Sequence, residues 1–142
     1  MEPSLKAWVR VTLLVGVVYL LVGRLFALPA THVQLWRLAA WVLSAAAFGA
    51  HIGYELFRLG NSPRTVALHT ALAVALGAFA LAVAGALHSL VASSSIRLAW
   101  LVAFVVWPVA TGVPAFLLAL VASTVLGRLP TRRRDTLQTS NH

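Results

Sequence analysis

The chain has 142 residues, of which 61% are hydrophobic and 10% are charged, and its formal net charge is +8. A soluble domain carries about 25% charged residues, so this chain has too few of them to cover a surface that faces water. The composition excludes an ordinary soluble protein, and the absence of cysteine excludes disulfides, thiolate nucleophiles and cysteine-ligated metal or iron–sulfur sites.

Four apolar segments follow one another along the chain. They cover about residues 7–28, 36–57, 65–90 and 98–126. A transmembrane helix needs about 20 predominantly apolar residues. We therefore predict an all-α, polytopic integral membrane protein, in which one domain of residues 1–129 forms a four-transmembrane-helix bundle. Residues 130–142 are polar and basic, and we expect them to form a disordered tail.

The first apolar segment is interrupted by charge, because only residues 11–23 lie between Arg10 and Arg24. A cleaved secretory signal is the alternative interpretation, with Lys6 and Arg10 in its basic region. The Leu-Pro-Ala sequence at residues 28–30 matches a small-x-small cleavage site poorly. We therefore expect this segment to remain in the mature protein.

The loop charges predict the orientation of the four segments. If the N-terminus is inside, eight of the eleven lysines and arginines lie on the inner side, and Arg24, Arg37 and Arg97 lie on the outer side. An excess of arginine and lysine marks the cytoplasmic side of a membrane protein. We therefore expect a multi-pass protein of a prokaryotic inner membrane, with both termini and the basic tail in the cytoplasm.

The positive charge also bears on the partners of the chain. Basic surfaces are typical of nucleic-acid-binding proteins, but here the basic residues flank apolar runs and no separate soluble domain presents them. We expect no nucleic-acid partner. The expected partner is the lipid bilayer, whose anionic headgroups attract basic segments such as RLPTRRR at residues 128–134.

The connection between the second and third segments has the composition of a tight turn. Gly60 can adopt the left-handed conformation that ends a helix, Ser62 can cap the next helix, and Pro63 suits the first helical position. These residues predict a tight antiparallel hairpin at the centre of the bundle. Before the second segment, residues 31–34 fit a capping box and predict that its helix begins ahead of the membrane.

Small residues predict where helices approach one another closely. In the second segment, Gly49 and Gly53 form a GxxxG pattern. The third segment carries a row of small residues at Ala71, Ala75, Ala78, Ala82 and Gly85.

In the fourth segment, Pro108 and Pro114 each remove a backbone donor and predict a kink.

Residues 50–69 hold the main concentration of acidic, basic and histidine side chains inside the apolar region. Glu55 is the only carboxylate between residues 3 and 134. At 1.5 Å per residue, Glu55 and His69 lie at similar depths of about 7–9 Å from the turn, and His51 lies about one helical turn deeper. We expect these three side chains to face one small volume in the inner half of the membrane.

The favoured interpretation of this cluster is structural. A buried carboxylate is costly unless it is paired, and His69, Arg58 and Arg64 are available as partners. Glu55, Arg58 and Arg64 then form a structural polar cluster that ties neighbouring helices together. The protein would be a non-catalytic accessory or structural subunit of a membrane complex, with other membrane subunits or further copies of itself as partners.

Two alternatives give the cluster a chemical role. His51 and His69, on adjacent antiparallel helices, have the pattern of axial ligands to a b-type haem in an electron-transfer subunit. His51, Glu55 and His69 could also bind a metal ion, or relay protons, in a small metal-ion or proton-coupled transporter. The sequence shows no nucleophile–base constellation, phosphate-binding loop or nucleotide motif, so an enzyme is the less favoured class.

Overall fold

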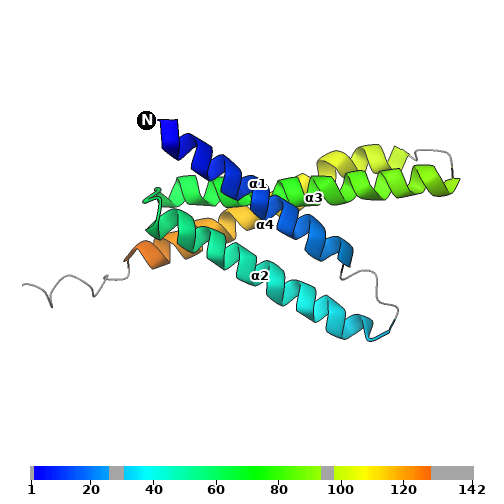
Figure 1. Cartoon of the computed structure of the whole chain (residues 1–142), viewed down its shortest axis with the longest axis horizontal. Helices are drawn as coiled ribbons and strands as arrows, with labels where there is room; N and C mark the ends of the chain where they lie inside the picture. The colour runs from blue at the N-terminus through cyan, green and yellow to red at the C-terminus, as the bar shows by residue number, and fades with distance from the viewer. Residues whose placement is uncertain (1, 26–30, 94–97, 129–142) are drawn as a thin grey trace, which may run out of the picture.

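The computed structural model describes residues 2–25, 31–93 and 98–128 of the chain. These residues form four helices, α1 (Glu2–Leu25), α2 (Val33–Phe57), α3 (Pro63–Ser93) and α4 (Leu98–Arg128) (Figure 1). Each helix includes a stretch that is long and apolar enough to cross a membrane. The all-α fold and the four helical segments are therefore confirmed, whereas the predicted tail at residues 130–142 lies outside the described residues.

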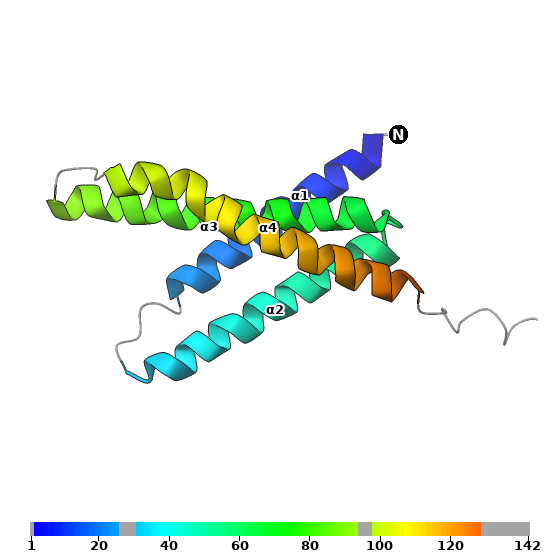
Figure 2. The same cartoon turned by 180° about the vertical axis from the view of Figure 1, so that it is seen from behind.

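The four helices splay apart instead of forming a parallel-sided bundle. α3 and α4 run side by side, α1 crosses α3, and α2 diverges from α3 beyond the turn that joins them (Figures 1 and 2). α3 packs against each of the other three helices, most extensively against α4. The predicted hairpin of α2 and α3 is therefore tight at its turn and open along its length, because α1 and α4 cover the small-residue surfaces of α3.

α1 and α3 cross at a point where both helices carry glycine. Gly16 and Gly77 are buried there. A Cβ atom added to Gly77 would lie 3.3 Å from the Gly16 carbonyl oxygen and 2.6 Å from the Tyr19 Cβ atom. The two backbones thus approach as closely as they do because Gly77 has no side chain, whereas a Cβ atom added to Gly16 would lie at an ordinary contact distance of 3.4 Å. Neither glycine belongs to the small-residue patterns recognised in the sequence.

The predicted row of small residues on α3 is the surface that receives α4. Gly112 of α4 lies against Ala71 and Ala75, and a Cβ atom added to Gly112 would be 3.3 Å from the Ala75 Cβ atom. Farther along the pair, the Trp100 ring covers Gly85. Close backbone packing, which stabilises helix pairs in lipid, therefore extends along much of the α3–α4 contact.

α4 continues through both of its internal prolines, Pro108 and Pro114. The Thr111 hydroxyl donates a hydrogen bond to the Trp107 carbonyl oxygen at 2.8 Å, close to the site where Pro108 lacks an N–H group. The axis of α4 bends near its middle in Figure 2, as the prolines predict.

The GxxxG pattern of α2 is not used within the described part of the chain. A Cβ atom added to Gly49 would have no neighbour within 4 Å, and one added to Gly53 would meet only the Phe57 ring, at 4.0 Å. The close helix packing expected at these two glycines is therefore missing inside the described chain. This face of α2 remains open to lipid or to another protein.

The buried apolar core lies at the end of the bundle that holds the α2–α3 turn. Ile52 of α2, Val66 and Ala67 of α3 and Ala119 of α4 are almost fully buried and pack together there. α2, α3 and α4 therefore meet at this end, and the polar side chains of residues 50–69 lie close to this contact.

The predicted turn is confirmed and the predicted capping box is wrong. Gly60 has a φ angle of 64°, and the Thr65 N–H donates to the Ser62 hydroxyl at 3.3 Å, so Ser62 caps α3. At the start of α2 the N-cap residue is His32, with a φ angle of 54° and no side-chain capping hydrogen bond. The cap position is thus one residue later than the capping-box pattern at Thr31 requires.

Candidate functional site

Glu55 is the centre of the polar cluster and is completely buried. It lies in the last turn of α2, where its two carboxylate oxygens are 2.9 and 2.8 Å from His69 Nδ1 of α3. The imidazole N–H donates to the carboxylate, and the two groups form a hydrogen-bonded ion pair when His69 is protonated. This contact agrees with the expectation from the sequence that Glu55 and His69 lie at similar depths on the two helices.

Asn61, in the turn, supplies a second donor to the same carboxylate. Its side-chain Nδ2 donates to Glu55 Oε2 at 2.7 Å, and its backbone N–H donates to the Glu55 carbonyl oxygen at 3.2 Å. The left-handed Gly60 brings Asn61 back over the end of α2. Sequence reasoning missed Asn61, although an asparagine next to a helix-ending glycine is a signal for a residue that bonds to the preceding helix.

Trp8 of α1 completes the surroundings of His69. The two rings are stacked, with their centroids 4.2 Å apart and an angle of 5° between their planes. Trp8 holds the imidazole plane in place and connects α1 to the polar cluster. The crossing of α1 over α3 brings Trp8 to the histidine.

His51 lies one turn before Glu55 on α2 and is 2% exposed. Its Nε2 atom is 3.4 Å from Glu55 Oε1, within ion-pair range. Neither ring nitrogen has a hydrogen-bond partner among the described residues, and the same holds for the buried hydroxyls of Thr12 and Thr70. Buried polar atoms in this situation usually bind water.

Arg58 and Arg64 are exposed and do not pair with Glu55. In the described part of the chain, only His51 and His69 form ion pairs with Glu55. The carboxylate points into the bundle, whereas both arginines lie at its end and face outwards. Of the three partners that the structural hypothesis offered, only His69 bonds to Glu55, and Asn61 takes the place that the hypothesis gave to the arginines.

The geometry does not support haem ligation by His51 and His69. A haem with two axial histidines occupies the space between the two imidazole rings. Here the Glu55 carboxylate occupies that space, since it contacts both His51 Nε2 and His69 Nδ1. The metal-ion alternative also lacks support, because the described residues contain no group of three histidine, cysteine or acidic side chains arranged to hold a metal ion.

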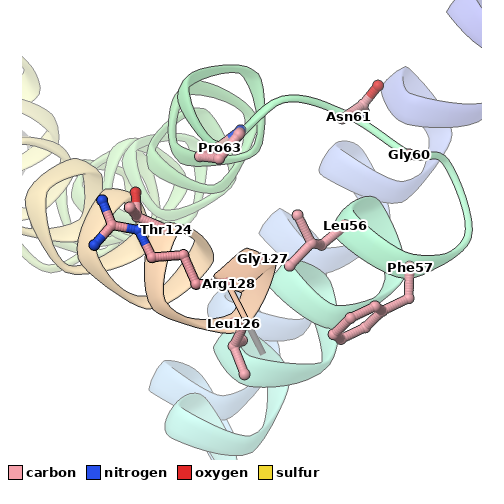
Figure 3. Close-up of a pocket in the computed structure, with 9 residues that line it drawn as sticks. All are labelled: Leu56, Phe57, Gly60, Asn61, Pro63, Thr124, Leu126, Gly127 and Arg128. Carbon is pink, nitrogen blue, oxygen red and sulfur yellow. The ribbon is translucent and has the colours of Figure 1, made fainter. Parts of the chain in front are cut away.

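The carboxylate and the two histidines of the polar cluster do not line the clefts described on the surface, although Asn61, which donates to Glu55, lines one of them. Clefts of about 520, 370, 300 and 500 Å³ occur among the described residues, and none of these four is lined by His51, Glu55 or His69. One of them lies between the α2–α3 turn and the end of α4 (Figure 3).

Comparison with protein-family models, with curated proteins and with solved structures found no match. The functional assignment therefore rests on the chemistry of the residues themselves.

Replacing Glu55 by alanine is expected to destabilise the protein strongly. The change leaves the buried His69 imidazole and the half-buried Asn61 amide without their acceptor, and breaking a buried pair in this way typically costs about 3–5 kcal/mol. Arg58→Gln is the matched control, since Arg58 is exposed, and its effect is expected to stay within about 0.5 kcal/mol. Thermal unfolding in detergent measures the stability of both variants. Equal losses of stability in the two variants would contradict the assignment of Glu55 as the structural centre.

Proposed function

We propose that this is a small multi-pass membrane protein that acts as a non-catalytic structural subunit of a membrane assembly. The observation that supports this proposal is the closed polar cluster. Glu55 is completely buried, its carboxylate accepts hydrogen bonds from His69 and Asn61, and it lines none of the four clefts. A carboxylate held in this way joins α2 to α3.

The surface of α2 supports assembly with a second protein. Only His51, Ile52 and Glu55 of this helix are buried, all of them near the turn. In the outer part of the helix, Trp41 is 77% exposed, and Gly49 has room for a close neighbour. We propose that α2 contacts another membrane subunit or a second copy of the chain, because GxxxG faces permit close helix association in lipid.

Substitution of Gly49 by leucine is the direct test of this contact. Because a side chain at Gly49 meets nothing in the described chain, the variant should fold normally and lose association by about tenfold or more. Ala110→Leu, at an exposed position of α4, is the control and should leave association unchanged. Crosslinking in native membranes followed by gel electrophoresis measures the assembly. If the wild-type protein is recovered only at its monomer mass, the proposal fails.

We also propose that the end of the bundle with the α2–α3 turn faces the cytoplasm of a prokaryotic cell. Arg58 and Arg64 in or beside the turn and Arg128 at the end of α4 are exposed at this end, in agreement with the positive-inside rule. Alkaline phosphatase fused to the C-terminus is expected to be inactive, because it requires export to form its disulfides. An active fusion would reverse the assigned orientation.

A second candidate function is proton transfer through the same cluster. It is favoured by the two ring nitrogens of His51 and the hydroxyls of Thr12 and Thr70, which are buried without hydrogen-bond partners in the described chain. Water molecules bound to these atoms would connect His51 to the region around Glu55. A histidine and a carboxylate linked by water can pass a proton between them.

Proton flux into liposomes distinguishes the two candidate functions. If the cluster transfers protons, the wild-type protein will acidify potassium-loaded vesicles after valinomycin is added, and Glu55→Gln will abolish this flux while Arg58→Gln will not. If the cluster is structural, vesicles with wild-type protein will behave like vesicles without protein. A pH-sensitive dye trapped inside the vesicles provides the measurement.

A further inference from the structure

The arginines around the α2–α3 turn have no acidic partner within the described chain. Arg58, Arg64 and Arg128 are exposed, and the ion pairs of the described residues involve only histidines. Among the side chains that the structure describes, Glu55 is the only acid, and it is buried and already bound by His69 and Asn61. The positive charge at this end is therefore left for an external anion.

Two adjoining clefts lie between these arginines. Arg128 lines a cleft of about 520 Å³, Arg64 lines a cleft of about 500 Å³, and the two clefts share Pro63 and Thr124. Figure 3 shows the Arg128 side chain extending back along α4 towards Thr124. Arg64 and Arg128 thus line neighbouring clefts that meet at Pro63 and Thr124, and the two clefts together are called the depression below.

The wall opposite Arg128 is apolar. Leu56 and Phe57, from the last turn of α2, and Leu126 of α4 line the same cleft as Arg128 (Figure 3). Phe57 is 60% exposed, although it lies beside the charged end of the bundle. A site with cations on one side and an exposed aromatic ring on the other fits a ligand that is itself both anionic and apolar.

We propose that this depression binds an anionic glycerophospholipid of the adjacent membrane leaflet. Arg128 and Arg64 contact the headgroup phosphate, since guanidinium groups bind phosphate through paired hydrogen bonds. Phe57 contacts the first part of an acyl chain. We expect the lipid to be anionic because two exposed arginines, Arg64 and Arg128, border the depression. This lipid site is independent of the proposed role as a subunit.

The test measures the retention of lipid by the delipidated full-length protein in an uncharged detergent. Phosphatidylglycerol and phosphatidylcholine are added separately, and native mass spectrometry gives the affinity of each. We expect the wild type to prefer phosphatidylglycerol, and the double variant Arg64→Gln/Arg128→Gln to bind it about tenfold or more weakly. Phe57→Ser is expected to weaken binding while leaving both arginines in place.

The matched control is Arg24→Gln/Arg37→Gln, which removes two exposed arginines at the other end of α1 and α2. Every variant keeps Arg132, Arg133 and Arg134, so the attraction of the tail is the same throughout. Equal binding of the two lipids by the wild type, or equal losses in the two double variants, would overturn the proposal. Inorganic phosphate that displaces phosphatidylglycerol at millimolar concentration would show that the site binds free phosphate, and would also overturn it.

Discussion

A carboxylate that is completely buried among apolar helices has to be neutralised where it lies, and the arrangement of this end of the bundle follows from that constraint. Glu55 requires a donor from outside its own helix, and His69 provides it only if α3 keeps a register that places the two residues at the same depth. Asn61 provides a second donor only if the chain turns back over the end of α2, which the left-handed Gly60 permits. The stacking of Trp8 on His69 then fixes α1 as well. Glu55 thus holds α2, α3 and the turn together directly, and α1 through the stacking of Trp8 on His69.

The remaining packing reflects the weakness of the forces between apolar helices in lipid. Lipid chains are as apolar as leucine, so helices gain little from burying aliphatic side chains against one another, and close backbone contact becomes the main source of stability. α3 has such contacts on two sides, with Gly77 against α1 and with Ala75 against Gly112 of α4. Before His51, α2 makes no comparable close backbone contact at its glycine, since a Cβ atom added to Gly49 would meet no described residue. This difference explains why α2 diverges from its neighbour and why its Gly49 face stays open.

Polar residues in this chain therefore divide into two groups with different roles. Those inside, with Glu55 at their centre, bind one another and hold helices together, and His51 is buried beside them. Those at the end, Arg64 and Arg128, bind nothing in the described chain and border open clefts. External ligands are consequently expected at the end of the bundle that carries these arginines, whereas the buried carboxylate is left for the fold or for protons.

The sequence by itself determined the class of the protein, the four helical segments, the turn at Gly60 and Ser62, and the nearly equal depths of Glu55 and His69. These properties depend on local composition and on the constant rise of a helix, which can be counted along the chain. The partners of Glu55 and the use of the glycines depended on tertiary structure. Arg58 and Asn61 are both near Glu55 in sequence, and only the path of the turn decides that Asn61 points inwards while Arg58 faces out. Likewise, the GxxxG pattern predicted a contact at Gly49 and no recognised pattern included Gly77, and only the crossing of α1 over α3 makes Gly77 a contact while Gly49 stays open.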